Sequence, residues 1–238
     1  MIPQHSPPKA CIFDVFGTVV DWRGSVSRFC KEFFSARNIS ADSTAFAEYW
    51  RGQYDPAMER VRSGGRGYVP LDELHFENLQ ATLAHFGLSD RLSSDELWQL
   101  NSAWEQLDPW PDVIAGLSTL RKQTIIAPCS NGSIALMTRL ARYADLPWDC
   151  ILGADIARNY KPHEAVYAAC CTALRLQPNE VMMVAAHNSD LEAAQRSGLQ
   201  TAFVARPVEH GPGQTKDLSP TGNWDPIITD FAVLARQP

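Results

Sequence analysis

Short apolar runs that alternate with helical patterns restrict the folds open to this chain more than any other feature. Five such runs occur, and helical patterns separate most of them. Strands that alternate with helices in this way predict a parallel sheet with both faces covered. We therefore expect an α/β fold with a doubly wound parallel sheet. The predicted strands are Ala10–Asp14, Thr124–Cys129, Cys150–Gly153, Val181–Ala186 and Thr201–Val204.

A long helical block interrupts this alternation after the first strand. From Ser25 to about Leu107 apolar residues recur at helical spacing, which predicts a helical cap subdomain inserted into a Rossmann-like core. The tail after Pro207 is rich in Gly and Pro, and we expect it to wrap the surface and close with a short helix over Ile227–Leu234. The expected core comprises residues 1–20 and 108–238, and the expected cap comprises 21–107. Predicted cap helices include Ala45–Val61, Leu71–Phe86 and one that begins at Ser93.

The composition restricts the kinds of partner that the chain can bind and the cellular compartment in which we expect it. The 238 residues carry a formal net charge of −6, and no basic stripe is available to meet a phosphate backbone, so we expect no nucleic-acid partner. No apolar run approaches the ~20 residues that span a bilayer, so we expect no membrane partner. Met1–Lys9 lacks the apolar core of a signal peptide, and the six cysteines form no C-x-x-C pair. We expect a cytoplasmic protein with buried, reduced thiols.

Polar residues gather at or just after the ends of the predicted strands. Asp14 ends the first strand, Ser130 and Asn131 follow the second, and Lys161 and the segment 187–190 lie at later ends. Because the carboxyl ends of parallel strands lie on one edge of a sheet, these residues should converge. One polar residue at a strand end is usually a turn former. Four such positions together indicate a site.

The segment Asp14-Val15-Phe16-Gly17-Thr18 is the most informative member of this set. It places a carboxylate at the tip of a buried strand, followed by a glycine that lets the backbone turn. The residue two positions after Asp14 is Phe16, and an aromatic ring cannot donate a proton to an alkoxide or phosphate ester. Residue type alone therefore disfavours phosphatase chemistry.

Together these motifs resemble the haloacid dehalogenase superfamily. Its signature is an aspartate nucleophile after the first strand, a Ser/Thr after the second, a lysine and a later acidic residue. These correspond here to Asp14, Ser130, Lys161 and Asp190. The resemblance covers about residues 9–206, with a helical cap in the expected place. Most members are phosphatases with an Asp-x-Asp motif and Mg²⁺. Phe16 replaces the second aspartate here, and Asp190 is the one carboxylate of the last motif, so few oxygen ligands are available for Mg²⁺.

The same segment is similar to that of the L-2-haloacid dehalogenases, which hydrolyse carbon–halogen bonds without a metal. A halide needs no proton in order to leave, so a second aspartate is not required. The resemblance implies hydrolysis of short (S)-2-haloacids or haloacetates to 2-hydroxy acids, with no cofactor, and it implies a homodimer. Further matches are Trp50-Arg51, Ser130-Asn131-Gly132, Tyr160-Lys161-Pro162 and Tyr167.

The resemblance implies a catalytic role for several residues. Asp14 attacks the carbon that bears the halogen, and water then hydrolyses the resulting ester. Lys161 keeps Asp14 ionised. Asp190 fixes Lys161 and helps to place the water, and Thr18 orients Asp14. Tyr167 and Asn188 are expected to support the site, although Tyr167 can also be read as an aromatic at the edge of the core.

The resemblance also implies how the substrate is bound. The Ser130 hydroxyl and the backbone N–H groups of Val15 and Phe16 grip the substrate carboxylate. Arg51 and Asn131 receive the departing halide through N–H donors. The ordinary alternative for Arg51 is a solvated helix residue.

The chain departs from the family pattern near the later carboxylate. Ala185 and His187 stand where the family commonly has Ser and Asn, Ser189 replaces a common Trp, and Gly52 follows Arg51 where glutamine is usual. The intrinsic pKa of an imidazole suits a base near neutral pH, so we hypothesise that His187 acts in ester hydrolysis. The alternative is that His187 packs in its loop and bonds to a backbone carbonyl.

Three further hypotheses stay open on the sequence. The loop Ala-Ala-His-Asn-x-Asp-Leu at 185–191 resembles a subgroup that includes enzymes active on fluoroacetate, so fluoroacetate hydrolysis is one. A Mg²⁺-dependent small-molecule phosphatase of the same superfamily is the second. The third is a non-catalytic protein that binds a small carboxylate or a partner. The presence of Asp14, Ser130, Lys161 and Asp190 together argues against the third.

Overall fold

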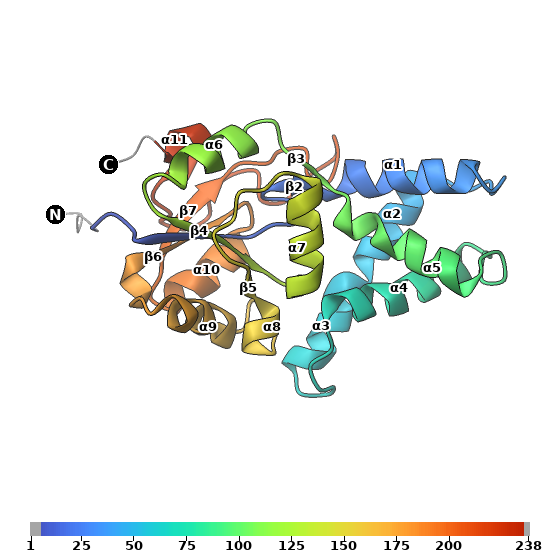
Figure 1. Ribbon diagram of the computed structural model, residues 1–238, viewed down its shortest axis with the longest axis horizontal. Helices are drawn as coiled ribbons and strands as arrows, with labels where there is room; N and C mark the ends of the chain where they lie inside the picture. Colours follow the sequence, from blue (N-terminus) through green and yellow to red (C-terminus); the bar gives the residue numbers. More distant parts are fainter. Residues whose placement is uncertain (1–5, 236–238) are drawn as a thin grey trace.

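The computed structural model describes residues 6–235 and contains a six-stranded parallel sheet. Its strand order is β5-β4-β1-β6-β7-β8, and every neighbouring pair is parallel. All five predicted strands are present, which confirms the α/β, doubly wound, Rossmann-like fold (Figure 1). The strands are β1 (Ala10–Phe13), β4 (Ile125–Ser130), β5 (Leu152–Gly153), β6 (Val181–Ala185), β7 (Gln200–Val204) and β8 (Ile227–Ile228).

Strand β8 corrects the prediction for the tail. The sequence predicts one short helix over Ile227–Leu234, but β8 occupies the first two of these residues and helix α11 covers Phe231–Leu234. The Ala205 N–H donates to the Ile228 carbonyl at 2.9 Å, so the tail satisfies backbone groups of the chain beyond β7. A strand of two residues is too short to show a period, which is why the sequence pattern misses it.

Side chains of β1 alternate between two apolar cores, one on each face of the sheet. Cys11 and Phe13 belong to the core that includes residues of α6, α7 and α11, whereas Ala10 and Ile12 belong to the core beneath α9 and α10. This two-residue period fits a strand covered on both faces. The helices are α6 (Val113–Leu120), α7 (Ile134–Tyr143), α9 (Glu164–Leu174) and α10 (Asn188–Arg196), with the short α8 (Ala154–Ala157) after β5.

The remaining helices form a group beside the sheet, on the right of Figure 1. The chain leaves for this group through β2 (Val20–Asp21) and returns through β3 (Asp108–Pro109), and these two strands pair antiparallel. The predicted start at Ser93 is confirmed by a capping box between Ser93 and Glu96. The helices are α1 (Trp22–Ser35), α2 (Ser43–Gly52), α3 (Tyr54–Arg62), α4 (Leu71–His85) and α5 (Ser94–Asn101), followed by a 3₁₀ turn over Ser102–Glu105.

One predicted helix of this group is two helices. The pattern over Ala45–Val61 predicts a continuous helix, but α2 ends at Gly52 and α3 begins at Tyr54. Pro56 has no N–H to donate to the Gly52 carbonyl, whereas a proline in the first turn of a new helix costs nothing. The break lies between Arg51 and Tyr54, both of which line the pocket described below.

The structure also bears on the predictions for the cysteines and for membrane-spanning helices. All six cysteines are free thiols, and five of them are buried as predicted, whereas Cys150 is half-buried. The sulfur atoms of Cys170 and Cys129 lie 3.6 Å apart, too far for a disulfide. Among residues 6–235, no helix has both the length and the apolar character needed to cross a membrane.

Candidate active site

A pocket of about 390 Å³ lies where the carboxyl ends of β1 and its neighbours meet the helical group. Because β4 and β6 flank β1, the residues that follow these strands share one edge of the sheet. Helices α2 and α3 supply Arg51, Tyr54 and Met58 to the same pocket. Seven predicted site residues line it: Asp14, Phe16, Arg51, Asn131, Lys161, His187 and Asp190.

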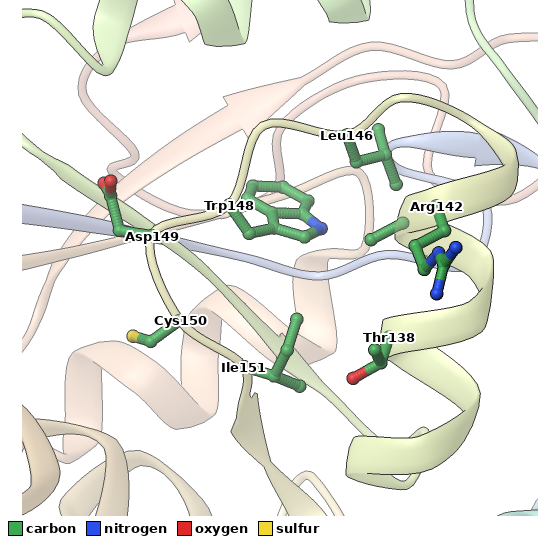
Figure 2. Close-up of a pocket in the computed structure, with 8 residues that line it drawn as sticks. Thr138, Arg142, Leu146, Trp148, Asp149, Cys150 and Ile151 are labelled. Atoms are coloured by element: carbon green, nitrogen blue, oxygen red, sulfur yellow. The ribbon is translucent and has the colours of Figure 1, made fainter.

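A second pocket, of about 280 Å³, lies between α7 and the loop that leads to β5 (Figure 2). Its lining includes Thr138, Arg142, Trp148 and Ile151, and no predicted site residue is among them. Figure 2 shows an indole and aliphatic side chains with one hydroxyl, one guanidinium, the Cys150 thiol and the Asp149 carboxylate. That carboxylate already accepts from Arg121 and from the Ile126 N–H. We therefore place the chemistry in the first pocket.

Lys161 joins two buried carboxylates at the centre of that first pocket. Its Nζ lies 2.8 Å from Asp14 Oδ1 and 2.6 Å from Asp190 Oδ2. Burial opposes ionisation of Asp14, but the Lys161 ammonium and His187 hold the pKa of this carboxyl well below its usual range. Burial also opposes the charge on Lys161, and the two carboxylates raise its pKa above the ordinary value. Asp14 and Lys161 are therefore both charged at neutral pH.

The pKa of the Asp190 carboxyl shifts in the opposite direction from that of Asp14. Burial raises the pKa of the Asp190 carboxyl, Lys161 opposes this effect, and the Asp14 charge adds to it. The Tyr167 hydroxyl donates to Asp190 Oδ1, so Tyr167 reaches the site through Asp190. Tyr167 is fully buried. Because its hydroxyl bonds to a carboxylate of the site, Tyr167 is not simply an aromatic residue of the apolar core.

The turn after β1 fixes the orientation of Asp14. The Thr18 hydroxyl donates to Asp14 Oδ2 at 2.6 Å and accepts from the Ala186 N–H at 2.9 Å, so it links β1 to β6. Gly17 has a φ of +86°, a conformation that residues with a Cβ rarely adopt. The Asp14 carboxylate therefore extends from a turn that Thr18 ties to the end of β6.

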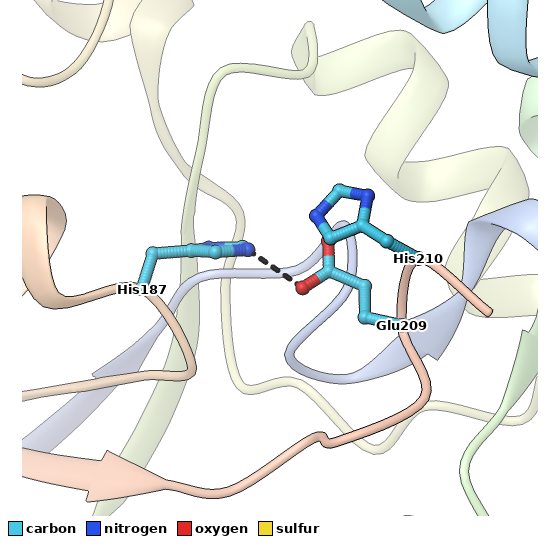
Figure 3. Close-up of side chains that lie close together, drawn as sticks. All are labelled: His187, Glu209 and His210. Carbon is cyan, nitrogen blue, oxygen red and sulfur yellow. Dashed lines mark hydrogen bonds and ion pairs between the residues drawn. The ribbon is translucent and has the colours of Figure 1, made fainter. Parts of the chain in front are cut away.

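His187 lies between two carboxylates. Its Nδ1 is 3.0 Å from Asp14 Oδ2. Its Nε2 is 2.9 Å from Glu209 Oε2, and Figure 3 shows this second contact. The alternative in which the ring bonds to a backbone carbonyl is therefore not the arrangement observed. Burial opposes the charge on His187, but Glu209 and Asp14 raise its pKa well above the ordinary value.

Glu209 is a site residue that the sequence analysis does not single out. Its side chain is 1 % exposed, so part of the tail enters the site instead of only wrapping the surface. The ligand atoms of His187, Glu209 and His210 lie within 4.8 Å of one another, close enough for a metal ion. Both ring nitrogens of His187 and both oxygens of Glu209 are already engaged, so we interpret the group as a chain of hydrogen bonds.

Of the predicted carboxylate-binding residues, Phe16 lines the pocket, whereas Val15 and Ser130 are fully buried. Ser130 is fully buried, does not line the pocket, and accepts a bond from the Gly132 N–H at 3.0 Å. Its hydroxyl proton remains available to donate. Within residues 6–235, the backbone N–H groups of Val15 and Phe16 donate to no backbone carbonyl of the turn. The Phe16 ring packs edge-on against Tyr54 and Trp104 and closes the apolar wall.

The predicted halide-binding residues both line the pocket, Arg51 from α2 and Asn131 from the chain just after β4. The Arg51 guanidinium carbon lies 4.0 Å from the centre of the Tyr54 ring, which places Arg51 in the wall instead of on a solvated face. Among the described residues, Arg51 Nε is buried and has no hydrogen-bond partner. Asn131 Oδ1 accepts from the Lys161 backbone N–H at 2.7 Å, so its amide nitrogen is the group left to donate, and it lies beside the Tyr54 hydroxyl.

Asn188 supports the site indirectly. Its side-chain amide donates to Asp217 Oδ1 and to the Ser219 carbonyl, and its oxygen accepts from Trp224 Nε1. It does not line the pocket. Asn188 therefore fastens the tail, which also carries Glu209, to the start of α10.

A model of the haloacid dehalogenase-like hydrolases matches residues 8–198. The chain belongs to this family. Its fold is similar to the crystal structure of the defluorinating L-2-haloacid dehalogenase Rha0230, with a TM-score of 0.94 and 47% identity, over 96% of this chain and 94% of that one. The L-2-haloacid dehalogenase PA0810 gives a TM-score of 0.93 and 44% identity, over 97% and 98% of the two chains.

A curated relative agrees with these structures. The (S)-2-haloacid dehalogenase 4A of Burkholderia cepacia is 29% identical over 201 residues, which cover 83% of each chain. The similarities place this member of the haloacid dehalogenase-like hydrolases in the L-2-haloacid dehalogenase branch.

The residues of this dehalogenase-like hydrolase do not fit a Mg²⁺ ion between Asp14 and Asp190. Mg²⁺ needs an octahedral shell of oxygen ligands at about 2.0–2.1 Å. The Lys161 ammonium already occupies the space between the two carboxylates and bonds to both. Phe16, whose ring packs against Tyr54 and Trp104, adds no carboxylate to this pair. The positive charge at this position is supplied by the chain itself.

Proposed function

We propose that this protein hydrolyses short (S)-2-haloacids or haloacetates to 2-hydroxy acids through an ester on Asp14. The observation that carries the proposal is a buried Asp14 carboxylate, held ionised by Lys161 at 2.8 Å, in a pocket that is also lined by the Phe16 ring, which has no proton to donate to a leaving group. An ionised carboxylate is a competent nucleophile, and a halide leaves without a proton. The haloacid dehalogenase names of the relatives support the same reaction.

In the first step, an oxygen of Asp14 attacks the substrate carbon that bears the halogen. A C–O bond forms as the carbon–halogen bond breaks, and the halide departs with the bonding electrons. Attack from the side opposite the halogen inverts the configuration at that carbon. Thr18 and Lys161 hold the Asp14 carboxylate in place for the attack.

Positively polarised groups around Asp14 bind the two ends of the substrate. We assign the substrate carboxylate to the Ser130 hydroxyl and the Val15 and Phe16 backbone N–H groups. We assign the halide to Arg51 and Asn131. The unpartnered, buried Arg51 Nε supports this assignment, because a buried donor without an acceptor is costly in the empty site and gains a partner in the halide.

In the second step, water attacks the carboxyl carbon of the Asp14 ester. The water oxygen bonds to this carbon, one water proton goes to His187, and the bridging oxygen leaves with the product as its hydroxyl group. Lys161 and Thr18 stay within reach of the carboxyl oxygens and stabilise the negative charge that develops there. Asp190 keeps Lys161 in position.

We also propose the roles of the two domains, the oligomeric state and the cellular location. Residues 21–107 act as a cap that closes the site against water, and residues 1–20 and 108–238 form the catalytic core. The active form is a homodimer, which light scattering on a sizing column would test. The protein works in the cytoplasm without a cofactor.

Halide release tests the proposed reaction directly. We expect release from chloroacetate and from (S)-2-chloropropionate, with (R)-lactate as the product of the latter, and at least about 10-fold slower release from the (R) enantiomer. EDTA should not alter these rates, because Lys161 supplies the positive charge at Asp14. Activity that EDTA abolishes, together with hydrolysis of a phenyl phosphate, would support the phosphatase alternative. An intact fold without halide release from any short 2-haloacid would support a binding protein.

Fluoroacetate is a second substrate that we propose. The similar L-2-haloacid dehalogenase Rha0230 is described as defluorinating, and it shares 47% identity with this chain. Fluoride is small and strongly hydrated, so its release needs close N–H donors, which Arg51 and Asn131 would supply. We expect a fluoride electrode to record release from fluoroacetate, with Asp14→Asn as the blank. Consumption of chloroacetate without any fluoride release from fluoroacetate would reject this extension.

A further inference from the structure

Glu209 is a buried carboxylate that the reaction proposed above does not use. It lies in the loop after β7, and its side chain is 1 % exposed. Trp22 Nε1 donates to Glu209 Oε1 at 3.1 Å, and His187 Nε2 lies 2.9 Å from Oε2 (Figure 3). A buried carboxylate is costly unless partners satisfy it. The partner that Glu209 shares with Asp14 is His187.

Gly17 makes room for this carboxylate. A Cβ at position 17 would lie 2.1 Å from Glu209 Oε1, so any side chain larger than hydrogen would displace the Glu209 side chain. The glycine of the Asp14 turn therefore has two functions, the positive φ of the turn and the close approach of Glu209. Glu209 is thus built into the same turn that presents Asp14.

The partners of His187 define its protonation in the resting enzyme. An ionised carboxylate accepts hydrogen bonds and donates none. Asp14 and Glu209 face the two ring nitrogens at 3.0 and 2.9 Å, so both nitrogens must donate, and the ring is an imidazolium. In this state His187 cannot take a proton from water. A step that removes the negative charge of Asp14 is needed before His187 can act as a base.

We propose that Glu209 is a positioning residue that acts through His187 in the hydrolysis of the Asp14 ester. The inference rests on the proposed function. Ester formation neutralises Asp14, so Nδ1 loses its anionic partner and its proton passes to solvent. Glu209 retains the Nε2–H, and the lone pair freed on Nδ1 faces Asp14 Oδ2, beside the carboxyl carbon that water must attack.

The protons balance over the cycle. The proton that leaves Nδ1 after ester formation is the proton that the overall reaction releases with the halide. In hydrolysis one proton of the attacking water ends on the product hydroxyl, and the other ends on His187. This restores the imidazolium and the Asp14 carboxylate together.

The charged groups around His187 come from several elements. Glu209 and Asp14 are in direct contact, while the Lys161–Asp190 pair lies on the far side of Asp14. Removal of the Glu209 charge should therefore lower the pKa of His187, because one of its two contacting anions is lost. Other charged or titratable groups near His187 or Glu209 are Arg51, His210, Lys216 and Asp217.

Glu209→Gln tests the proposal, because the substitution removes the charge and keeps the size. With (S)-2-chloropropionate we expect the single-turnover rate of halide release to stay within about 3-fold of wild type, and kcat to fall by about 10- to 100-fold. Intact-protein mass spectrometry of quenched samples should then show the Asp14 ester accumulating. His187→Gln should accumulate the same ester, and the double variant should be no slower than the slower single variant. Glu192→Gln, an exposed carboxylate on α10, is the matched control.

The pH profile separates positioning from a structural role. In the wild type, kcat should fall as the pH falls through the pKa of His187 in the ester, because only the neutral ring accepts a proton. In Glu209→Gln this acid limb should move to lower pH by at least about one unit. Equal losses in the halide burst and in kcat, with an unmoved acid limb, would overturn the proposal. A wild type that releases no halide would instead refute the proposed function.

Discussion

Asp14→Asn is expected to lower the rate of halide release from (S)-2-chloropropionate by at least about 10⁴-fold, because the amide oxygen is a poor nucleophile. Lys161 would keep Asp190 as a partner, so the fold should survive. Ion chromatography of chloride measures the effect, and circular dichroism checks the fold.

The matched control for this substitution is Asp90→Asn, which changes an exposed aspartate in the loop between α4 and α5. It should leave the rate within about 2-fold of wild type. Asp14→Ala should be as inactive as Asp14→Asn. More than one part in a hundred of the wild-type rate in Asp14→Ala would mean that water, and not Asp14, displaces the halide.

Lys161→Met is expected to destabilise the fold as well as abolish activity. Lys161 is 6 % exposed and bonds to two buried carboxylates, so its removal leaves Asp14 and Asp190 without their cation. Removing one partner of a buried ion pair typically costs about 3–5 kcal/mol of the free energy of unfolding. Urea unfolding at pH 7 measures this loss. Lys31→Met, an exposed lysine on α1, should change the free energy of unfolding by no more than about 0.5 kcal/mol.

The Lys161→Met defect should depend on pH with a definite sign. In the wild type the pKa of Asp14 is depressed, so its contribution to stability is present above the ordinary pKa of an aspartate and is lost in acid. Without Lys161, burial would raise the pKa of Asp14 above the unfolded value and would raise that of Asp190, which is already above it, further, so the variant gains stability as the pH falls. The difference between wild type and variant should therefore shrink from pH 8 to pH 5. A difference that grows toward pH 5 would contradict this electrostatic account.

The sequence predicts the part of the site that follows the strands. The apolar runs around Asp14, Ser130 and His187 mark strands, and a parallel sheet brings their carboxyl ends together whatever the loops do. Lys161 and Asp190 follow from the same topology and from the family pattern. The distances from Lys161 to both carboxylates agree with that expectation.

Contacts between distant segments are not predictable from the sequence when neither segment has a helical or strand-like hydrophobic repeat. Glu209 lies in a Gly- and Pro-rich tail, and nothing in its neighbours shows that it returns to the turn at Gly17. The side chain of Asn188 likewise binds tail residues whose positions no local pattern specifies. Strand β8 forms because the edge of β7 offers unpaired backbone groups, a property of the sheet and not of the two residues that join it.

The sequence and the structure each explain one function of Gly17. From the sequence, this glycine is a turn former after a strand. In the structure, the missing Cβ is also the space that the Glu209 carboxylate fills beside His187. The motif around Asp14 therefore serves the second half of the reaction as well as the first.

Single-turnover hydrolysis of (S)-2-chloropropionate in ¹⁸O-water, with enzyme in excess, tests the covalent ester most directly. Water attacks the Asp14 carboxyl carbon in this account, so the label should appear in the peptide that contains Asp14, and the lactate should carry ordinary oxygen. Label in the lactate, with none in the Asp14 peptide, would mean direct attack of water on the substrate carbon and would contradict the account.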